Sequence, residues 1–339
     1  MAPGAVGRKS TIAAGGATAA AEQRAERALL AKPSRAKVER DAQAVRDQIA
    51  RDRAQRYAAY LQQVVDPTEP PAALAKETDV HTLRVAALVK GKQKLRILAE
   101  GDSWFAYPIP LGKGDGVIVQ LQKLLGYSIN NMANAGDAVS KMLGLADRQE
   151  IISRLNDGSI RYDAMLFSGG GDDLVGDQLI TWLKNKGPVP PPAQMLYDEA
   201  VDAGISLLEA EYKELIGIRD QYSPGTIIFV NTYDFPKVTG KGVCGYGPWL
   251  KPSLDYAYQQ MGVSSPSQAQ EDLVVKELLE RFGKMLQKIA SDPTLKFIAV
   301  PTQGTLNPNT DWQNEIHPTQ DGFIKIAKKF QTAPKAAFP

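Results

Sequence analysis

From residue 95 onward, short runs rich in β-branched and aromatic residues alternate with helix-length amphipathic segments, and this alternation most constrains the fold. The runs read LRILAE, YSINNMA, YDAMLFS, TIIFVNTY and KFIAVP. Apolar residues recur at helical spacing over residues 116–125, 140–155, 194–221, 268–290 and 320–330. Parallel strands need crossover connections of helix length, so we expect a five-stranded parallel sheet covered by helices. The predicted three-layer α/β/α domain spans residues 91–335.

The first 90 residues differ in composition and are expected to form an N-terminal extension. Residues 1–65 hold 12 Lys and Arg against 6 Asp and Glu, although the whole chain has a net charge of only +2. Residues 1–20 are small and polar, which favours disorder. Apolar residues at helical spacing over 35–65, ended by the DPTEPP sequence, predict an amphipathic helix. This helix is expected to pack on the main domain or to form a homodimer; a basic arm on an anionic surface is an alternative.

The composition excludes several classes of function. A single cysteine, Cys244, cannot form an intrachain disulfide, and with only two histidines the chain lacks the ligands of Cys-rich and of most multi-His metal centres. A net charge of +2 provides no basic footprint for nucleic acid. We find neither a membrane-spanning apolar window nor the apolar core of a signal peptide. We expect no metal, no cofactor and no nucleic-acid partner, and a protein that is cytoplasmic or exported without a cleaved signal.

One long segment interrupts the alternation of strands and helices. Residues 235–262 follow the fourth predicted strand and contain FPKVTGKGVCGYGPWLKPSLDY, which is dense in Gly, Pro and aromatic residues. Open α/β sheets place their ligands beyond the carboxyl ends of the strands, where long irregular loops are usually functional. We therefore predict a functional loop or lid, whose aromatic side chains line an acyl or sugar pocket or serve ordinary packing.

Two residues at opposite ends of the predicted domain have the chemistry of an acyl-transfer site. The first strand ends in Gly101, Asp102 and Ser103, and a hydroxyl on a tight turn at a sheet edge can act as a nucleophile beside a backbone N–H. Near the C-terminus, His317 precedes a predicted helix opened by Pro318 and can act as a general base. A helix-capping Ser and a surface His are the alternative interpretations.

With these residues and two further blocks, the chain resembles the SGNH/GDSL hydrolase superfamily over about residues 94–332. In that family a Gly-Asp-Ser block supplies the nucleophile, a Gly and an Asn after later strands complete the oxyanion hole, and Asp-x-x-His supplies the acid and the base. The matching blocks are residues 101–103, 131–136, 170–174 and 314–317. The resemblance implies a flavodoxin-like fold, Ser103 as nucleophile, His317 as base, and the N–H groups of Ser103 and Gly136 as oxyanion donors.

The chain departs from the family at two positions. Asp172 stands where the family has its oxyanion Asn, and an ionised carboxylate cannot stabilise an oxyanion unless it is protonated or turned away. Asn314 stands where the family has its acid, and it can orient an imidazole without stabilising an imidazolium. Glu315, Asp311 and Asp172 are candidates to replace that acid. A Ser-His dyad oriented by a backbone carbonyl is the simplest account.

Together, these observations predict a serine ester hydrolase that cleaves carboxylic esters through an acyl-enzyme on Ser103. The substrate remains open between short acyl esters, lipids and O-acetyl groups of glycans. Asp172 and Asn314 leave one alternative, a catalytically impaired binding protein with the same fold. The acidic run SGGGDDLVGD lacks the oxygen spacing of a cation-binding loop, so it predicts no metal site.

Overall fold

The computed structural model describes residues 35–64, 94–107, 116–243 and 245–337. The chain divides into two compact units, residues 1–54 and residues 55–339. Helix α2 (Arg35–Val64) confirms the helix predicted over residues 35–65 and contains residues of both units. The disorder predicted for residues 1–20, the domain boundary near residue 90 and the thiol of Cys244 lie outside the described residues.

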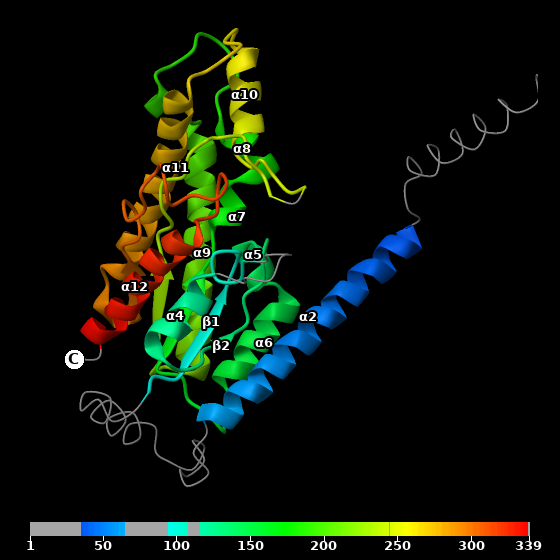
Figure 1. Ribbon diagram of the computed structural model, residues 1–339, viewed down its shortest axis with the longest axis vertical. Coiled ribbons are helices and arrows are strands. Elements are labelled where there is room, and N and C mark those ends of the chain that lie inside the picture. The colour runs from blue at the N-terminus through cyan, green and yellow to red at the C-terminus, as the bar shows by residue number, and fades with distance from the viewer. Residues whose placement is uncertain (1–34, 65–93, 108–115, 244, 338–339) are drawn as a thin grey trace, which may run out of the picture. The chain divides into compact units, whose positions relative to one another are not determined.

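A five-stranded parallel sheet in the order β2-β1-β3-β4-β5 forms the centre of the second unit. Two of its strands, β1 and β2, are labelled in Figure 1. Each strand pairs in parallel with its neighbours. β1 and β3 are buried along their whole length, which explains their nearly unbroken apolar sequences. The predicted sheet is confirmed, and its strands are β1 (Ile97–Gly101), β2 (Asn130–Asn131), β3 (Ala164–Ser168), β4 (Ile227–Asn231) and β5 (Phe297–Val300).

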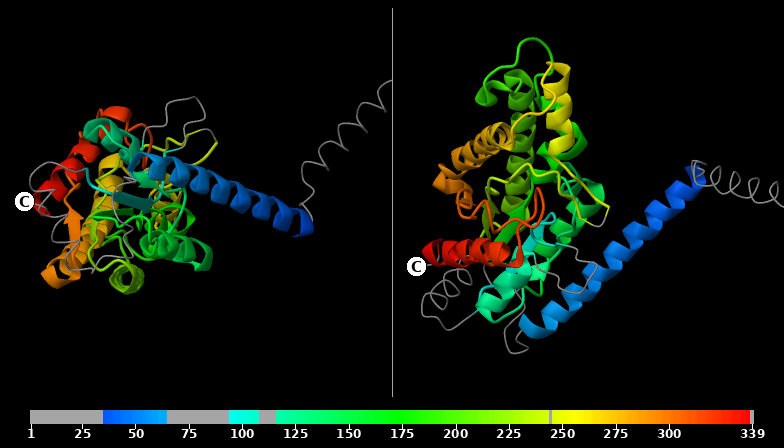
Figure 2. Two further views of the ribbon diagram at one scale, coloured as in Figure 1. Left: turned by 90° about the horizontal axis from the view of Figure 1, so that it is seen from below. Right: turned by 45° about the horizontal axis from the view of Figure 1, so that its top comes forward.

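The long helices form two packed groups, as expected for a sheet covered on both faces. In the first group, α4 (Val117–Leu125) packs against the C-terminal helix α12 (Gln320–Ala337), drawn in red in Figure 2. In the second, α9 (Asp198–Tyr222) packs against α6 (Leu145–Leu155) and α11 (Gln268–Ala290). The predicted three-layer α/β/α architecture follows from these two groups and the sheet.

Two of the predicted segments differ from the structure. The helix predicted over residues 140–155 is divided at Gly144 into α5 (Val139–Met142) and α6. The loop predicted over residues 235–262 is only partly irregular, because α10 (Lys251–Gln260) occupies its second half. Pro252 lies in the first turn of α10, where the backbone N–H groups have no helical partner in any case. The shorter elements are α7 (Gly171–Leu174), η2 (Gly176–Gln178), α8 (Leu179–Trp182), η3 (Pro192–Gln194) and η4 (Pro293–Leu295).

The last turns of α2 are part of the core of the second unit. Tyr60 is buried and stacks on Tyr162, with ring centroids 6.3 Å apart. The guanidinium of Arg154 lies 3.8 Å from the ring centroid of Tyr57, which is also buried. Packing on the main domain, one of the two predicted roles of the helix, therefore holds for its C-terminal turns. None of the helices in the described ranges is long and apolar enough to cross a membrane.

Candidate active site

Ser103 lies on a tight turn that directly follows β1. The N–H groups of Phe105 and Ala106 donate to the carbonyl of Asp102 at 3.1 and 3.0 Å, which closes the turn. Position 101 requires glycine, because a Cβ there would lie 2.8 Å from the Cβ of Ser168 on the neighbouring strand. The turn thus brings Ser103 to the carboxyl edge of the sheet, where only 6% of its surface is exposed.

The carboxylate of Asp102 stabilises this turn by accepting hydrogen bonds. It accepts hydrogen bonds from the Trp104 N–H at 2.9 Å, from the Ser168 hydroxyl at 3.0 Å and from the Tyr233 hydroxyl. Burial raises the pKa of Asp102 to about 6, although the three donors favour its ionised form. Asp102 is therefore a paired carboxylate that fixes the turn of Ser103 and is ionised at neutral pH.

Ser103, His317 and Asn314 form a continuous hydrogen-bonded chain. The Nε2 atom of His317 lies 2.7 Å from the Oγ of Ser103, and its Nδ1 atom lies 3.0 Å from the Oδ1 of Asn314. The same Oδ1 accepts the backbone N–H groups of Ile316 and His317, which fixes the orientation of the amide. Since Oδ1 can only accept, Nδ1 carries the proton and Nε2 presents a lone pair to the Ser103 hydroxyl. This is the tautomer that a general base needs.

His317 is buried among aromatic side chains. Its ring centroid is 4.5 Å from that of Tyr107, and Trp249 approaches it edge-on at 5.3 Å. Burial lowers the pKa of His317 to about 3, because the imidazolium would lose its hydration. The imidazole is therefore neutral at physiological pH.

Two of the three carboxylates expected to replace the family's acid, Glu315 and Asp311, are engaged elsewhere. Glu315 is fully buried and accepts four backbone N–H groups, those of Gly240, Trp249, Leu250 and Lys251. Asp311 accepts the Asn307 N–H at 2.6 Å and pairs with Lys325. The expected backbone carbonyl is also wrong as the partner of Nδ1, because the Asn314 side chain takes that place. Glu315 instead ties the predicted lid segment to the histidine loop.

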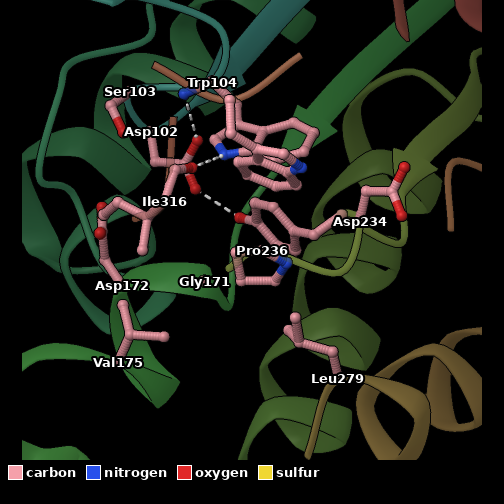
Figure 3. A pocket seen from close by; sticks show the side chains of 12 residues that line it. Asp102, Ser103, Trp104, Gly171, Asp172, Val175, Asp234, Pro236, Leu279 and Ile316 are labelled. Atoms are coloured by element: carbon pink, nitrogen blue, oxygen red, sulfur yellow. Dashed lines mark hydrogen bonds between the residues drawn. The ribbon is translucent and has the colours of Figure 1, made fainter. Parts of the chain in front are cut away.

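A small cavity of about 40 Å³ opens beside Ser103 (Figure 3). The indole Nε1 of Trp104 donates to the Ile316 carbonyl at 2.9 Å, which connects the turn of Ser103 to the loop that carries His317. Asp102, Ser103, Asp172 and Asp234 supply its acidic and hydroxyl side chains. Most of the remaining wall is apolar or aromatic, from Trp104, Val175, Tyr233, Leu279, Trp312 and Ile316.

The two further residues predicted for the oxyanion hole are placed differently. Asp172 lines the cavity on the same side as Ser103 in Figure 3. Its Oδ2 atom is buried and has no hydrogen-bond partner among the described residues. Burial raises the pKa of Asp172 to about 8, and the charges of three other aspartates add to this. Gly136 has a left-handed φ of 82°, is exposed, and does not belong to the cavity wall.

Sequence reasoning missed two aromatic residues of the site, Tyr233 and Trp312. Tyr233 closes the TIIFVNTY run at the carboxyl end of β4, a position that could have indicated it. Of the aromatics predicted in the lid, Trp249 contacts His317, whereas Tyr246 and Tyr256 are exposed. Within the described ranges, no group of three or more His, Cys, Asp or Glu side chains is arranged to hold a metal ion.

Comparison with known proteins returns structures of lipases and esterases. No family model matches the sequence, and no curated protein does. The chain is similar to an extracellular lipase from Streptomyces rimosus, with 15% identity, 71% of this chain and 100% of that one covered, and a TM-score of 0.44. A phospholipase A1 from Streptomyces albidoflavus has 14% identity, coverage of 71% and 99%, and a TM-score of 0.44. A family 3 carbohydrate esterase from Clostridium thermocellum has 16% identity, coverage of 73% and 98%, and a TM-score of 0.41.

Proposed function

We propose that this chain is a serine ester hydrolase that uses Ser103 as nucleophile and His317 as general base. The observation that carries the proposal is the chain of contacts from Ser103 through His317 to Asn314, with distances of 2.7 and 3.0 Å. A nucleophile, its base and the group that orients the base thus lie within hydrogen-bond reach beside a cavity. A helix-capping Ser or a surface His would not need this arrangement.

In the first half-reaction, the Ser103 Oγ attacks the ester carbonyl while its proton moves to the Nε2 of His317. The carbonyl π electrons move to the oxygen, which becomes the oxyanion of a tetrahedral intermediate. When the intermediate collapses, the bond to the alcohol oxygen breaks, and that oxygen takes the proton from Nε2. The products of this step are the free alcohol and an acyl group bound to Ser103.

In the second half-reaction, water takes the place of the alcohol. His317 accepts a proton from the water, whose oxygen attacks the acyl carbon, and the Ser103 oxygen leaves and regains a proton from Nε2. The N–H of Ser103 has no hydrogen-bond acceptor in the part of the chain that the structure describes, so it is free to bind the oxyanion in both steps. No cofactor enters this sequence of steps.

The size of the cavity favours esters with a short acyl chain. A space of about 40 Å³ is a few times the roughly 10–15 Å³ that one water molecule requires by the same measure. A short acyl group such as acetyl is therefore of the size that this cavity suits, whereas a long lipid acyl chain would extend beyond it. Acetylated glycans and small acyl esters are the substrate classes we propose.

The alternative is a binding protein that has lost catalysis. It is favoured by the absence of a carboxylate beside His317 Nδ1 among the described residues and by the low pKa of that histidine, since both weaken the base. Such a protein would bind acylated ligands in the same cavity without forming an acyl-enzyme. The predicted compartment and the predicted homodimer do not distinguish the two functions.

A fluorophosphonate probe separates these two functions directly. The enzyme should be labelled covalently at Ser103 and should hydrolyse p-nitrophenyl acetate, and Ser103→Ala should lose both properties. Ser159→Ala is a matched control, because the Ser159 hydroxyl is exposed and donates to the neighbouring Asp157. Wild-type protein that binds acetyl esters but neither hydrolyses them nor reacts with the probe would establish the binding protein instead.

A further inference from the structure

We propose that Asp172 acts as a neutral carboxylic acid that donates a hydrogen bond to the oxyanion formed at Ser103. This inference rests on the proposed function, because an oxyanion exists only if Ser103 forms an acyl-enzyme. It gives a role to Asp172, which in its ionised form would repel the oxyanion. It also predicts a loss of activity at alkaline pH that an amide at the same position would not show.

The position of Asp172 suits this role. It lies in the first turn of α7, lines the same small cavity as Ser103, and has a buried carboxyl oxygen without a partner. A buried carboxyl group without a donor is costly when ionised and less costly when it carries its proton. The O–H of the neutral acid can then point into the cavity, where the only strong acceptor to appear during the reaction is the oxyanion.

The neighbouring acids explain why the proton stays on Asp172. Asp102 has three hydrogen-bond donors, and Asp173 accepts the Val139 N–H at 2.9 Å. Asp137, from the loop after β2, accepts from the side-chain amide of Asn134. These three carboxylates have donors that stabilise their negative charge, and Asp172 has none in the described structure. When several carboxyl groups share one site, the group without donors retains its proton.

No positively charged side chain from the described part of the chain lines the cavity to offset this crowding. Of the described residues that line it, none is Lys or Arg; the remaining titratable groups are Tyr233, which donates to Asp102, and Asp234, which accepts several backbone N–H groups. Burial, followed by the charges of Asp102, Asp173 and Asp137, accordingly raises the pKa of Asp172 to about 8. The donor is thus present at neutral pH and is lost as the pH rises through about 8.

The test is the pH dependence of kcat for p-nitrophenyl acetate in wild type and three variants. A donor with a pKa of about 8 falls about tenfold in population between pH 7 and pH 9. Wild-type kcat should fall by that factor, whereas D172N, whose amide donates at every pH, should show no such fall. D172A, which has no donor, should lose about 10²- to 10³-fold at pH 6.5. D177N makes the same Asp-to-Asn substitution at an exposed position in the adjacent 3₁₀ helix η2 and should keep the wild-type profile.

The outcomes separate this inference from the proposed function. If the fluorophosphonate probe labels Ser103 but D172N loses activity above pH 8 as wild type does, Asp172 is not the donor. If D172A is as active as D172N at pH 6.5, the donor role is equally overturned. An unlabelled Ser103 would overturn the proposed function and the catalytic role together. Carboxyl ¹³C NMR, assigned by the resonance missing in D172N, tests the protonation state without activity: a midpoint near pH 8 supports the proposal and one below pH 5 overturns it.

Discussion

The loop that carries His317 and the turn that carries Asp172 border the same cavity, but their buried carboxyl groups are treated in opposite ways. In the histidine loop, Glu315 accepts four backbone N–H groups and Asp311 pairs with Lys325. In the turn of residues 170–175, Asp172 has a buried oxygen with no donor. A paired carboxylate holds its loop in place, whereas an unpaired one is tolerated as a neutral acid that remains available for a ligand. The paired carboxylates hold the histidine loop in place, and the unpaired Asp172 is the group to which we assign the oxyanion donor.

The largest expected effect comes from removing the imidazole of His317, which lies in the loop with the paired carboxylates. His317→Ala should lower kcat for p-nitrophenyl acetate by about 10³-fold or more, because no other described base lies at Ser103 Oγ. The protein should remain folded, since the loop is held by Glu315 and Asp311 rather than by the imidazole. Steady-state kinetics and a thermal melt measure the two properties. A variant that retains a tenth of the wild-type kcat would show that another group activates Ser103.

The second effect concerns the unpaired carboxyl group and is a dependence of stability on pH. The pKa of Asp172 is raised to about 8 in the folded chain, against about 4 in the unfolded chain. The stability that this group contributes is therefore fully present below about pH 4 and is lost as the pH rises through about 8, by up to about 1.4 kcal/mol per pH unit. Relative to wild type, D172N should gain stability steadily over this range. Urea unfolding at pH 5 and pH 8 measures the difference, and an equal difference at both would contradict it.

The third effect tests the rigidity of the histidine loop. Glu315→Gln leaves one acceptor oxygen for four N–H groups, so two of them lose their partner whichever way the amide turns. The free energy of unfolding should fall by about 2–3 kcal/mol. Glu280→Gln is the matched control, because that side chain pairs with Lys276 at the surface and contributes about 0.5 kcal/mol or less. Equal stabilities of the two variants in urea would show that the buried carboxylate does not hold the loop.

The fold was largely predictable because its signal is local. Four of the five strands, β1, β3, β4 and β5, are short and mainly apolar runs, and α11 begins at a capping box of Ser267 and Gln270. Helix α10 was missed because it follows a stretch dense in Gly and Pro, and its entry is fixed by Glu315, 64 residues from Lys251. A contact between residues so far apart does not affect the local pattern of apolar residues from which helices are predicted.

The site was predictable in its residue types and not in its electrostatics. The blocks around Ser103 and His317 identified the pair that the structure brings within 2.7 Å. The orientation of the Asn314 amide depends on two N–H groups of a turn, and the protonation of Asp172 depends on Asp102, which lies 70 residues away in the sequence. Both follow from three-dimensional neighbours, so the residue type alone predicted a weak triad and a repulsive oxyanion site.

The smallest effect comes from restoring a carboxylate beside the imidazole of His317. This change tests the histidine loop most directly. In Asn314→Asp, a carboxylate oxygen would replace the Oδ1 that now lies 3.0 Å from His317 Nδ1, and the Tyr107 hydroxyl, 3.3 Å from the present Nδ2, can turn to donate to the other oxygen. The negative charge should raise the pKa of His317 from about 3, making Nε2 a stronger base.

Because the base works in its neutral form, activity rises with pH through this pKa, and a higher pKa moves the acid limb of kcat/KM to higher pH. At neutral pH kcat should increase by about tenfold, or about 1.4 kcal/mol in activation free energy. An acid limb that does not move would mean that the introduced carboxyl group stays protonated, and that the aromatic environment of His317 rather than residue 314 sets the strength of the base.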